Sequence, residues 1–202
     1  MNKQTNKIKK RYNRISELPG FMDFMIRSSW RKELLRKVEG NILEVGVGTG
    51  SNFAYYPLNA NVTGIDFSPK MLEQAAKKLA QSKADINLKE MDAQAMDFAD
   101  NTFDYVVTSC VFCSVPDPIK GLKEIRRVVK PGGTIVMLEH MRSNNGFIGR
   151  VLDIINPLTV RLTGANVNRK TIRNIESAGL KVVSQRFLMT SIMRELVITP
   201  NK

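Results

Sequence analysis

The chain of 202 residues is the size of a single domain with short additions. Its composition, 43% hydrophobic and 25% charged, is typical of a globular protein and excludes wholesale disorder. Two cysteines argue against a secreted disulfide scaffold and favour a reducing cytoplasm. No uncharged apolar run reaches the roughly 18 residues that a membrane span needs, and the basic N-terminus lacks the features of a signal peptide. We therefore expect a cytoplasmic protein with one domain.

The net charge of +12 is unevenly distributed along the chain. Residues 1–40 carry +7 and residues 141–202 carry +7, whereas the segment between them carries −2. Two basic flanks around a near-neutral middle favour contact with an anionic partner, such as lipid headgroups, nucleic acid or a phosphorylated small molecule. Improved solubility is an equally simple explanation of such charge runs.

The first 40 residues predict a basic N-terminal helical cap on a domain that spans residues 41–202. Residues 1–14 are polar and basic, and we expect them to be frayed. From Phe21 to Val38, apolar residues recur every three or four positions, which predicts an amphipathic helix that ends at Gly40.

Strand and helix patterns alternate through the middle of the chain. Strands are expected in NILEVGVGTG, at Val62–Ile65, in INLKEMDA, at Phe103–Cys113 and at Thr134–His140. Two helices lie between them, one capped by Ser68 and running to about Gln81, the other opened by Asp117-Pro118 and stopped by Pro131-Gly132-Gly133. Central strands that read as continuous apolar runs indicate a parallel sheet with helices on both faces.

The C-terminal part predicts a different arrangement. Asn168 is a candidate cap for a helix that reaches Ala178 and stops at Gly179. Two strand-like runs follow, Lys181–Leu188 and Ile192–Thr199, close enough to form an antiparallel pair at the sheet edge.

Glycines cluster in EVGVGTG, between the first strand and an expected helix start. Glycine lets the backbone turn and approach a ligand closely at such a point. The spacing is G-x-G-x-G, because Ser51 stands where a dinucleotide fingerprint has its third glycine, and no P-loop lysine follows. Taken alone, this loop is a weak signal.

Two acidic residues strengthen the signal. Asp66 ends the second strand, 20 residues after Gly46, where a carboxylate can bind both hydroxyls of a ribose, and Asp92 ends the third strand. Ligands of open α/β sheets bind beyond the carboxyl ends of the strands. We therefore expect the glycine loop, both aspartates and the end of the fourth strand near Cys110 to form one crevice for a ligand with a ribose and an adenine.

These motifs, together with GIDFSPKML, FDYVV and RVVKPGG–TIVMLEH, resemble class I S-adenosylmethionine (AdoMet)-dependent methyltransferases of the type 11-like group. The resemblance covers about residues 40–140, with the motifs in the expected order. It implies a Rossmann-like, doubly wound, mostly parallel seven-stranded sheet with an antiparallel last strand, and AdoMet as cofactor with S-adenosylhomocysteine as product.

The resemblance also implies roles for individual residues. Those that would contact the methionine part are Glu44, Gly46, Gly48 and Gly50. Asp66 would hold the ribose, flanked by Phe67 and Ser68. Asp92 would meet the adenine amino group, with the Ala93 amide at the ring edge. A backbone carbonyl near Ser109 or Cys110 would accept from the methionine ammonium.

A narrower resemblance concerns the acceptor. VFCSVPDP, LEHM and GANVNRKTIRNIESAGL are similar to segments of the alkyl-thiol methyltransferases of animals and of small bacterial phosphatidylethanolamine N-methyltransferases. The ubiquinone/menaquinone C-methyltransferases share the core motifs but less of these segments. Substrate preference changes readily on one scaffold, so a thiol, a phospholipid amine and a quinone-like acceptor all stay open.

Other reactive residues have plain structural interpretations. Cys110 and Cys113 form a C-x-x-C pair, but a buried strand end is a poor redox setting, and zinc would need more ligands than the single His140. We therefore expect no metal. His140 ends a strand at the ligand-binding edge and is the one weak candidate for a general base; an equal alternative is that it caps the strand.

The apolar segment Gly146–Leu162 is too short and too charged to span a bilayer. It could form a lid over the acceptor pocket, contact a membrane interface or pack into the core, and Asn156-Pro157 should break it into two pieces.

The sequence predicts methyl transfer from AdoMet to a small apolar or amphiphilic acceptor, by an enzyme in peripheral contact with a membrane. An RNA methyltransferase is the first alternative, suggested by the basic flanks, although no RNA-binding module or aromatic-rich basic motif is present and nucleic acid is not expected as a partner. A non-catalytic AdoMet-binding protein is the second.

Overall fold

The computed structural model describes residues 3–16 and 26–202. Its strands form one seven-stranded sheet in the order β3-β2-β1-β4-β5-β7-β6. The strands β1 to β5 are mutually parallel, while β7 runs antiparallel to both β5 and β6. Their bounds are β1 Asn41–Val45, β2 Asn61–Asp66, β3 Asp85–Glu90, β4 Phe103–Ser109, β5 Val129–His140, β6 Lys181–Met189 and β7 Met193–Thr199. The predicted sheet, including the antiparallel pair at its edge, is confirmed.

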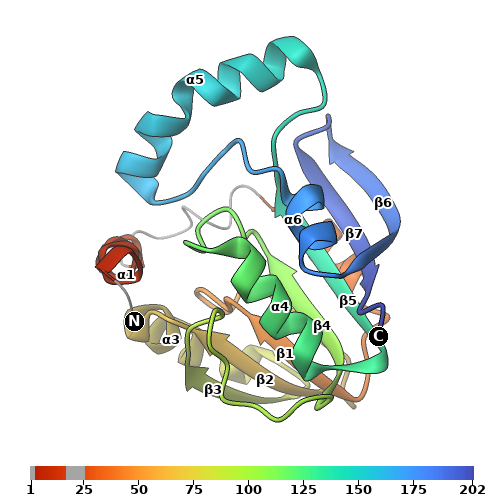
Figure 1. Cartoon of the computed structure of the whole chain (residues 1–202). Helices are drawn as coiled ribbons and strands as arrows, with labels where there is room; N and C mark the ends of the chain where they lie inside the picture. Colours follow the sequence, from red (N-terminus) through yellow and green to blue (C-terminus); the bar gives the residue numbers. More distant parts are fainter. Residues whose placement is uncertain (1–2, 17–25) are drawn as a thin grey trace.

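Helices cover both faces of the sheet (Figure 1). One core cluster packs α4 and α6 against the strands, and the other packs α2, α3 and the short turn η2 against the opposite face. The two remaining helices, α1 and α5, lie beyond the edge of the sheet. The bounds are α1 Lys3–Ile15, α2 Ser28–Leu35, η2 Phe53–Tyr55, α3 Pro69–Ala76, η3 Leu79–Gln81, α4 Pro118–Val128, α5 Gly146–Thr163 and α6 Thr171–Ser177.

Two predicted helix starts are confirmed by their caps. The Ser68 side chain accepts a hydrogen bond from the Met71 amide at 3.2 Å, and Asp117 accepts from the Lys120 amide at 3.0 Å, with proline in the first turn of each helix. Ser68 follows the end of β2 closely, and Asp117 follows the loop that leaves β4, so the two caps place α3 and α4 at the carboxyl ends of these strands.

Several predicted boundaries are wrong for local reasons. The helix from Ser68 ends at Ala76, and η3 takes up the last residues of the predicted span. Likewise, α4 ends at Val128, and Pro131-Gly132-Gly133 belongs to β5 rather than to a loop. Glycine at position 133 permits the close pairing of β5 with β4, because a Cβ there would lie 2.8 Å from the Asp104 carbonyl oxygen. The strand β4 ends at Ser109, short of the predicted Cys113.

The segment Gly146–Thr163 forms one helix, so the predicted break at Asn156-Pro157 is wrong. The Asn145 side chain caps its start by accepting from two backbone amides, and Gly164 ends it at φ +84°. A proline removes only one hydrogen bond from a helix of 18 residues. The predicted cap of α6 is also wrong, because Asn168 donates instead to Asp153 at 3.1 Å and the helix begins at Thr171.

The N-terminal region departs most from expectation. Residues predicted to be frayed form α1 instead. Of the helix predicted for residues 21–38, the structure describes α2 only; Phe21, Phe24 and Met25 lie outside the described residues. The helix α2 ends at Leu35, and Gly40, at φ +73°, leads directly into β1. In the described part of the chain, no helix has both the length and the apolar character needed to cross a membrane. The division at residue 40 stays a prediction.

Candidate functional site

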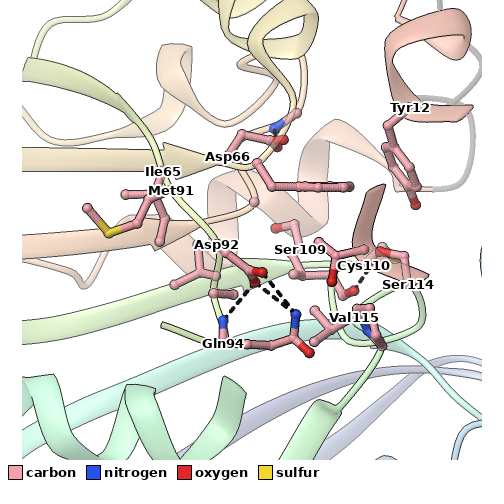
Figure 2. A pocket seen from close by; sticks show the side chains of 18 residues that line it. Tyr12, Ile65, Asp66, Met91, Asp92, Gln94, Ser109, Cys110, Ser114 and Val115 are labelled. Carbon is pink, nitrogen blue, oxygen red and sulfur yellow. Dashed lines mark hydrogen bonds between the residues drawn. The ribbon is translucent and has the colours of Figure 1, made fainter. Parts of the chain in front are cut away.

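A cavity with an empty volume of about 610 Å³, part of it open to solvent, lies at the carboxyl ends of four parallel strands. Figure 2 shows its wall, with side chains from successive strand ends and from α1 directed toward one space. The predicted site residues in this wall are Gly46 and Gly48 after β1, Asp66 and Phe67 at β2, Asp92 and Ala93 after β3, and Ser109 and Cys110 at β4. The predicted crevice is therefore present.

The glycine loop turns sharply at the end of β1. The amides of Gly46 and Val47 both donate to the Ile65 carbonyl, at 2.8 and 3.1 Å. Gly46 has φ +71°, and a Cβ there would lie 2.6 Å from a Val111 methyl carbon, so only glycine fits. Gly50 has φ +77° but packs against Phe53 and is not part of the cavity wall, so it shapes the loop from outside.

Asp66 is a buried carboxylate at the end of β2. Its Oδ2 accepts from the Gly48 amide at 3.0 Å and its Oδ1 from the Ser68 amide at 2.9 Å. Burial raises the pKa of Asp66 to about 6, an effect that these backbone donors oppose. Each carboxylate oxygen can accept two hydrogen bonds, so capacity remains for a further donor such as a ribose hydroxyl. Ser68 itself is buried beneath the carboxylate and lies outside the cavity wall.

Asp92 is fixed by Gln94, a residue that the sequence analysis missed. The Gln94 side-chain amide donates to both carboxylate oxygens of Asp92, at 2.9 and 3.1 Å, and its carbonyl accepts from the Asp117 amide at 3.0 Å (Figure 2). Gln94 thus links the end of β3 to the cap of α4. The signal in the sequence was Asp92 itself, because an aspartate side chain commonly accepts from the backbone amide two residues later, here that of Gln94 at 2.9 Å.

The helix α1 forms one wall of the cavity, opposite the strand ends. Thr5, Ile8 and Tyr12 share one buried face at helical spacing, and the Tyr12 ring lies 5.5 Å from that of Phe67. Asn13 accepts from the Ser68 hydroxyl at 2.5 Å, which ties α1 to the start of α3. Thr5 and Tyr12 belong to the cavity wall. The single Ile8–Tyr12 pair, four residues apart in a basic run, was the only signal in the sequence.

A second, smaller cavity of about 420 Å³ lies on the other side of the glycine loop and contains Glu44. Glu44 accepts from Asn52 at 2.8 Å and from the Tyr56 hydroxyl at 2.9 Å, and burial raises its pKa to about 7. The Arg31 guanidinium donates to Asn52 at 2.7 Å and also lines this cavity. Arg31 comes from α2 and was missed, because nothing near it in the sequence marks it.

The residues at the ends of β4 and β5 are mostly structural. Cys110 and Cys113 are both free and buried, and burial raises the pKa of Cys110 to about 12. Cys110 has φ +55°, an unusual value for a non-glycine residue, and turns the chain away from β4 into the cavity wall. His140 is half-buried at the end of β5, burial lowers its pKa, and it does not line the first cavity. Its role as a base stays a prediction.

A family profile described as a methyltransferase domain matches residues 43–137, the part that contains the glycine loop and both aspartates. This segment, just under half of the chain, is thus similar to a methyltransferase domain. The predicted resemblance to class I AdoMet-dependent methyltransferases is thereby confirmed.

Curated relatives carry related domains. The chain is 40% identical over 114 residues to a phosphatidylethanolamine N-methyltransferase of Cereibacter sphaeroides, over 55% of this chain. It is 38% identical over 141 residues to a demethylmenaquinone methyltransferase of Staphylococcus aureus, over 65% of this chain. In each case the match covers 56% of the relative, so the chain spans about half the length of these proteins.

A solved AdoMet-dependent methyltransferase from Thermotoga maritima shares the fold. It is similar with a TM-score of 0.67 at 21% identity, over 96% of this chain and 100% of that one. The similarity therefore includes the elements beyond the family match, such as the antiparallel pair β6 and β7.

The residues of the methyltransferase domain fit AdoMet. The first cavity offers carboxylates at the ends of β2 and β3 for a ribose and an adenine amino group. The second offers Arg31, whose charge suits the methionine carboxylate, and the two cavities share Gly46, Gly48, Ser109 and Cys110. If AdoMet occupies both cavities, its nucleoside lies in the first and its methionine part in the second, so only the methionine part would contact Glu44.

Replacing Asp66 by alanine should weaken AdoMet binding at least tenfold, because the ribose loses a charged acceptor worth roughly 1.5–3 kcal/mol. Calorimetric titration measures this, with circular dichroism to verify folding. Asp85→Ala is the matched control, since Asp85 is exposed at the opposite end of β3. Wild-type affinity in Asp66→Ala would refute the assignment.

Replacing Tyr12 by alanine should speed AdoMet dissociation about two- to tenfold, because the ring packs on Phe67 and closes the cavity. Stopped-flow displacement measures the rate. Lys10→Ala is the control, since Lys10 lies on the exposed side of the same helix. If both variants release AdoMet at the wild-type rate, α1 is not a lid.

Proposed function

We propose that this protein transfers a methyl group from AdoMet to a small amphiphilic acceptor of the lipid or quinone type. The observation that carries the proposal is the Asp66 carboxylate, which two backbone amides hold in the wall of a cavity within the segment that matches a methyltransferase domain. The names of the relatives support the acceptor class, because phosphatidylethanolamine and demethylmenaquinone are both amphiphiles.

The chain's own contribution is positioning. AdoMet supplies a methyl carbon already activated by its sulfonium, so orientation and exclusion of water provide much of the rate. The carboxylates of Asp66 and Asp92 orient the nucleoside, while α1 and the apolar wall of Val111 and Val115 exclude water. A general base is needed only for a protonated nucleophile. Burial lowers the pKa of His140, which favours the neutral imidazole that such a base requires.

The exposed side of α5 supports an amphiphilic acceptor. Phe147 and Ile154 are each 78% exposed, and the four other members of what we term the α5 apolar face, Val151, Ile155, Leu158 and Leu162, are exposed as well. Helical spacing places all six on one side, opposite the buried Gly149 and Leu152. So large an apolar surface is characteristic of a binding face.

The charges around the α5 apolar face match an anionic membrane surface. Arg150 and Arg161 are exposed along one border of the face. The helix α1 adjoins α5 through Arg11, which donates to the Val160 carbonyl at 2.8 Å, and its outer side carries the exposed Lys7 and Lys10. Each cation near anionic headgroups contributes roughly 1 kcal/mol. We propose that α5 lies in the interface of an anionic bilayer and delivers the acceptor from it.

A turnover screen tests the reaction. Formation of S-adenosylhomocysteine is measured with phosphatidylethanolamine, quinone precursors, alkyl thiols and structured RNA as acceptors, and Asp66→Ala serves as the inactive control. We expect turnover with a lipid or quinone-like acceptor. Turnover with RNA alone would establish the alternative enzyme, and AdoMet binding without any turnover would establish a non-catalytic protein.

Vesicle co-sedimentation tests the membrane contact. The protein should pellet with anionic liposomes at low salt, and Phe147→Ser with Ile154→Ser should reduce partitioning at least tenfold, since each buried side chain contributes roughly 1.5–3 kcal/mol. Leu58→Ser is the control, because Leu58 is 77% exposed but lies far from α5, before β2. Equal partitioning of the double variant and wild type would contradict the proposal, as would concentration-dependent dimerisation lost in the double variant.

A further inference from the structure

A separate cleft, distinct from the two cavities described above, lies between the end of β5, the start of α6 and β7. We term it the basic cleft. Its volume is about 830 Å³. No residue in its lining carries a carboxylate, and five are cations: Arg142, Arg169, Lys170, Arg173 and Arg194. The methyltransferase reaction as derived above uses none of them.

The charge in the cleft is only partly balanced, since Asp153 acts electrostatically on Lys170 and Asp117 on Arg169. Arg142 pairs with Asp153 at 2.8 Å, but across residues 3–16 and 26–202 the other four cations have no carboxylate within ion-pair distance. Arg194 is only 3% exposed and donates to four neutral oxygens, those of Ser191 at 2.9 Å, Asn144 at 2.8 Å, and Gln185 and the Arg142 backbone at 3.3 Å each. Its burial lowers its pKa. A buried guanidinium without a counter-charge is costly, and an anion would offset that cost.

Two hydrogen-bonding groups in the same cleft lack partners. The Nε of Arg169 and the hydroxyl of Thr171 are both buried, and no acceptor or donor among the described residues meets them. Nearly all buried polar atoms in proteins are hydrogen-bonded, and both of these groups can donate to an anion.

The two arginines are already held in place. The Arg194 guanidinium stacks 5.0 Å above the centre of the Phe187 ring, and Nη2 of Arg169 donates to the Val115 carbonyl at 2.8 Å. Fixed guanidinium groups lose little entropy when an anion binds beside them.

We propose that the basic cleft binds a phosphate group, through the exposed Lys170 and Arg173, with the charges of Arg169 and Arg194 and the Thr171 hydroxyl in support. A concave site with buried donors suits one phosphate group better than an extended polyanion. Val115 lines the AdoMet cavity as well, so Arg169 joins the two sites. If the phosphate belongs to the acceptor, this assignment rests on the proposed function; phosphate binding itself does not.

Calorimetric titration with inorganic phosphate, at constant ionic strength against chloride, tests the site. We expect saturable binding to the wild-type protein and at least tenfold weaker binding to Lys170→Gln/Arg173→Gln, whose side chains are exposed and do not support the core. Lys123→Gln/Lys181→Gln removes the same charge from exposed positions outside the cleft and should bind phosphate as wild type. Equal affinity in all three proteins, or no preference over chloride, would overturn the proposal.

Two further arms separate the sources of the phosphate. A soluble short-chain phosphatidylethanolamine that competes with phosphate identifies a lipid headgroup; glycerol phosphate competing where the lipid does not identifies a free phosphate ester. Both results support the site, and competition by neither overturns it. AdoMet affinity is measured on the same variants and should be unchanged, so a failure of the phosphate site is distinguishable from a failure of the methyltransferase site.

Discussion

A carboxylate buried at the end of a strand is unfavourable unless backbone donors meet it, and in this fold the amides of Gly48 and Ser68 meet Asp66 from two sides. The first amide requires the left-handed turn of the glycine loop, at φ +55° for Gly48, and the second requires the start of α3. The same Ser68 hydroxyl holds Asn13 of α1. The glycine loop, α3 and α1 are thus arranged around the Asp66 carboxylate. Its pKa of about 6 leaves it mostly ionised at neutral pH.

The part of the fold around this charge is predictable because its signals are local. The strands β1 and β4 are mostly buried, so their sequences are rich in apolar residues. The caps Ser68 and Asp117 act within three residues of themselves. The parallel topology then brings strand ends together without further information, so that Asp66 and Asp92 could be placed in one crevice from their positions alone.

The elements that were predicted wrongly depend on contacts between distant segments. Neither Ile8 nor Tyr12 forms a convincing apolar stripe in a basic segment, and α1 is stable because those two side chains pack on Phe67 and Met71. The local rule for Asn156-Pro157 fails because α5 is held at other points: Asn156 accepts from the Val167 amide at 2.9 Å, and Asp153 pairs with Arg142. Arg31 and Arg169 were missed because their partners lie in other elements.

These features divide the molecule by task. In the function proposed above, the carboxyl ends of β1 to β4 bind the methyl donor. The segment from Met141 to Arg173 adds the α5 apolar face and most of the basic cleft, and Asn166 anchors it by donating to the Cys113 carbonyl beside the cavity (Figure 1). An apolar helix and a cation-lined cleft on one segment match the two halves of a phospholipid. Acceptor preference can therefore change through this segment while Asp66 and its donors stay as they are.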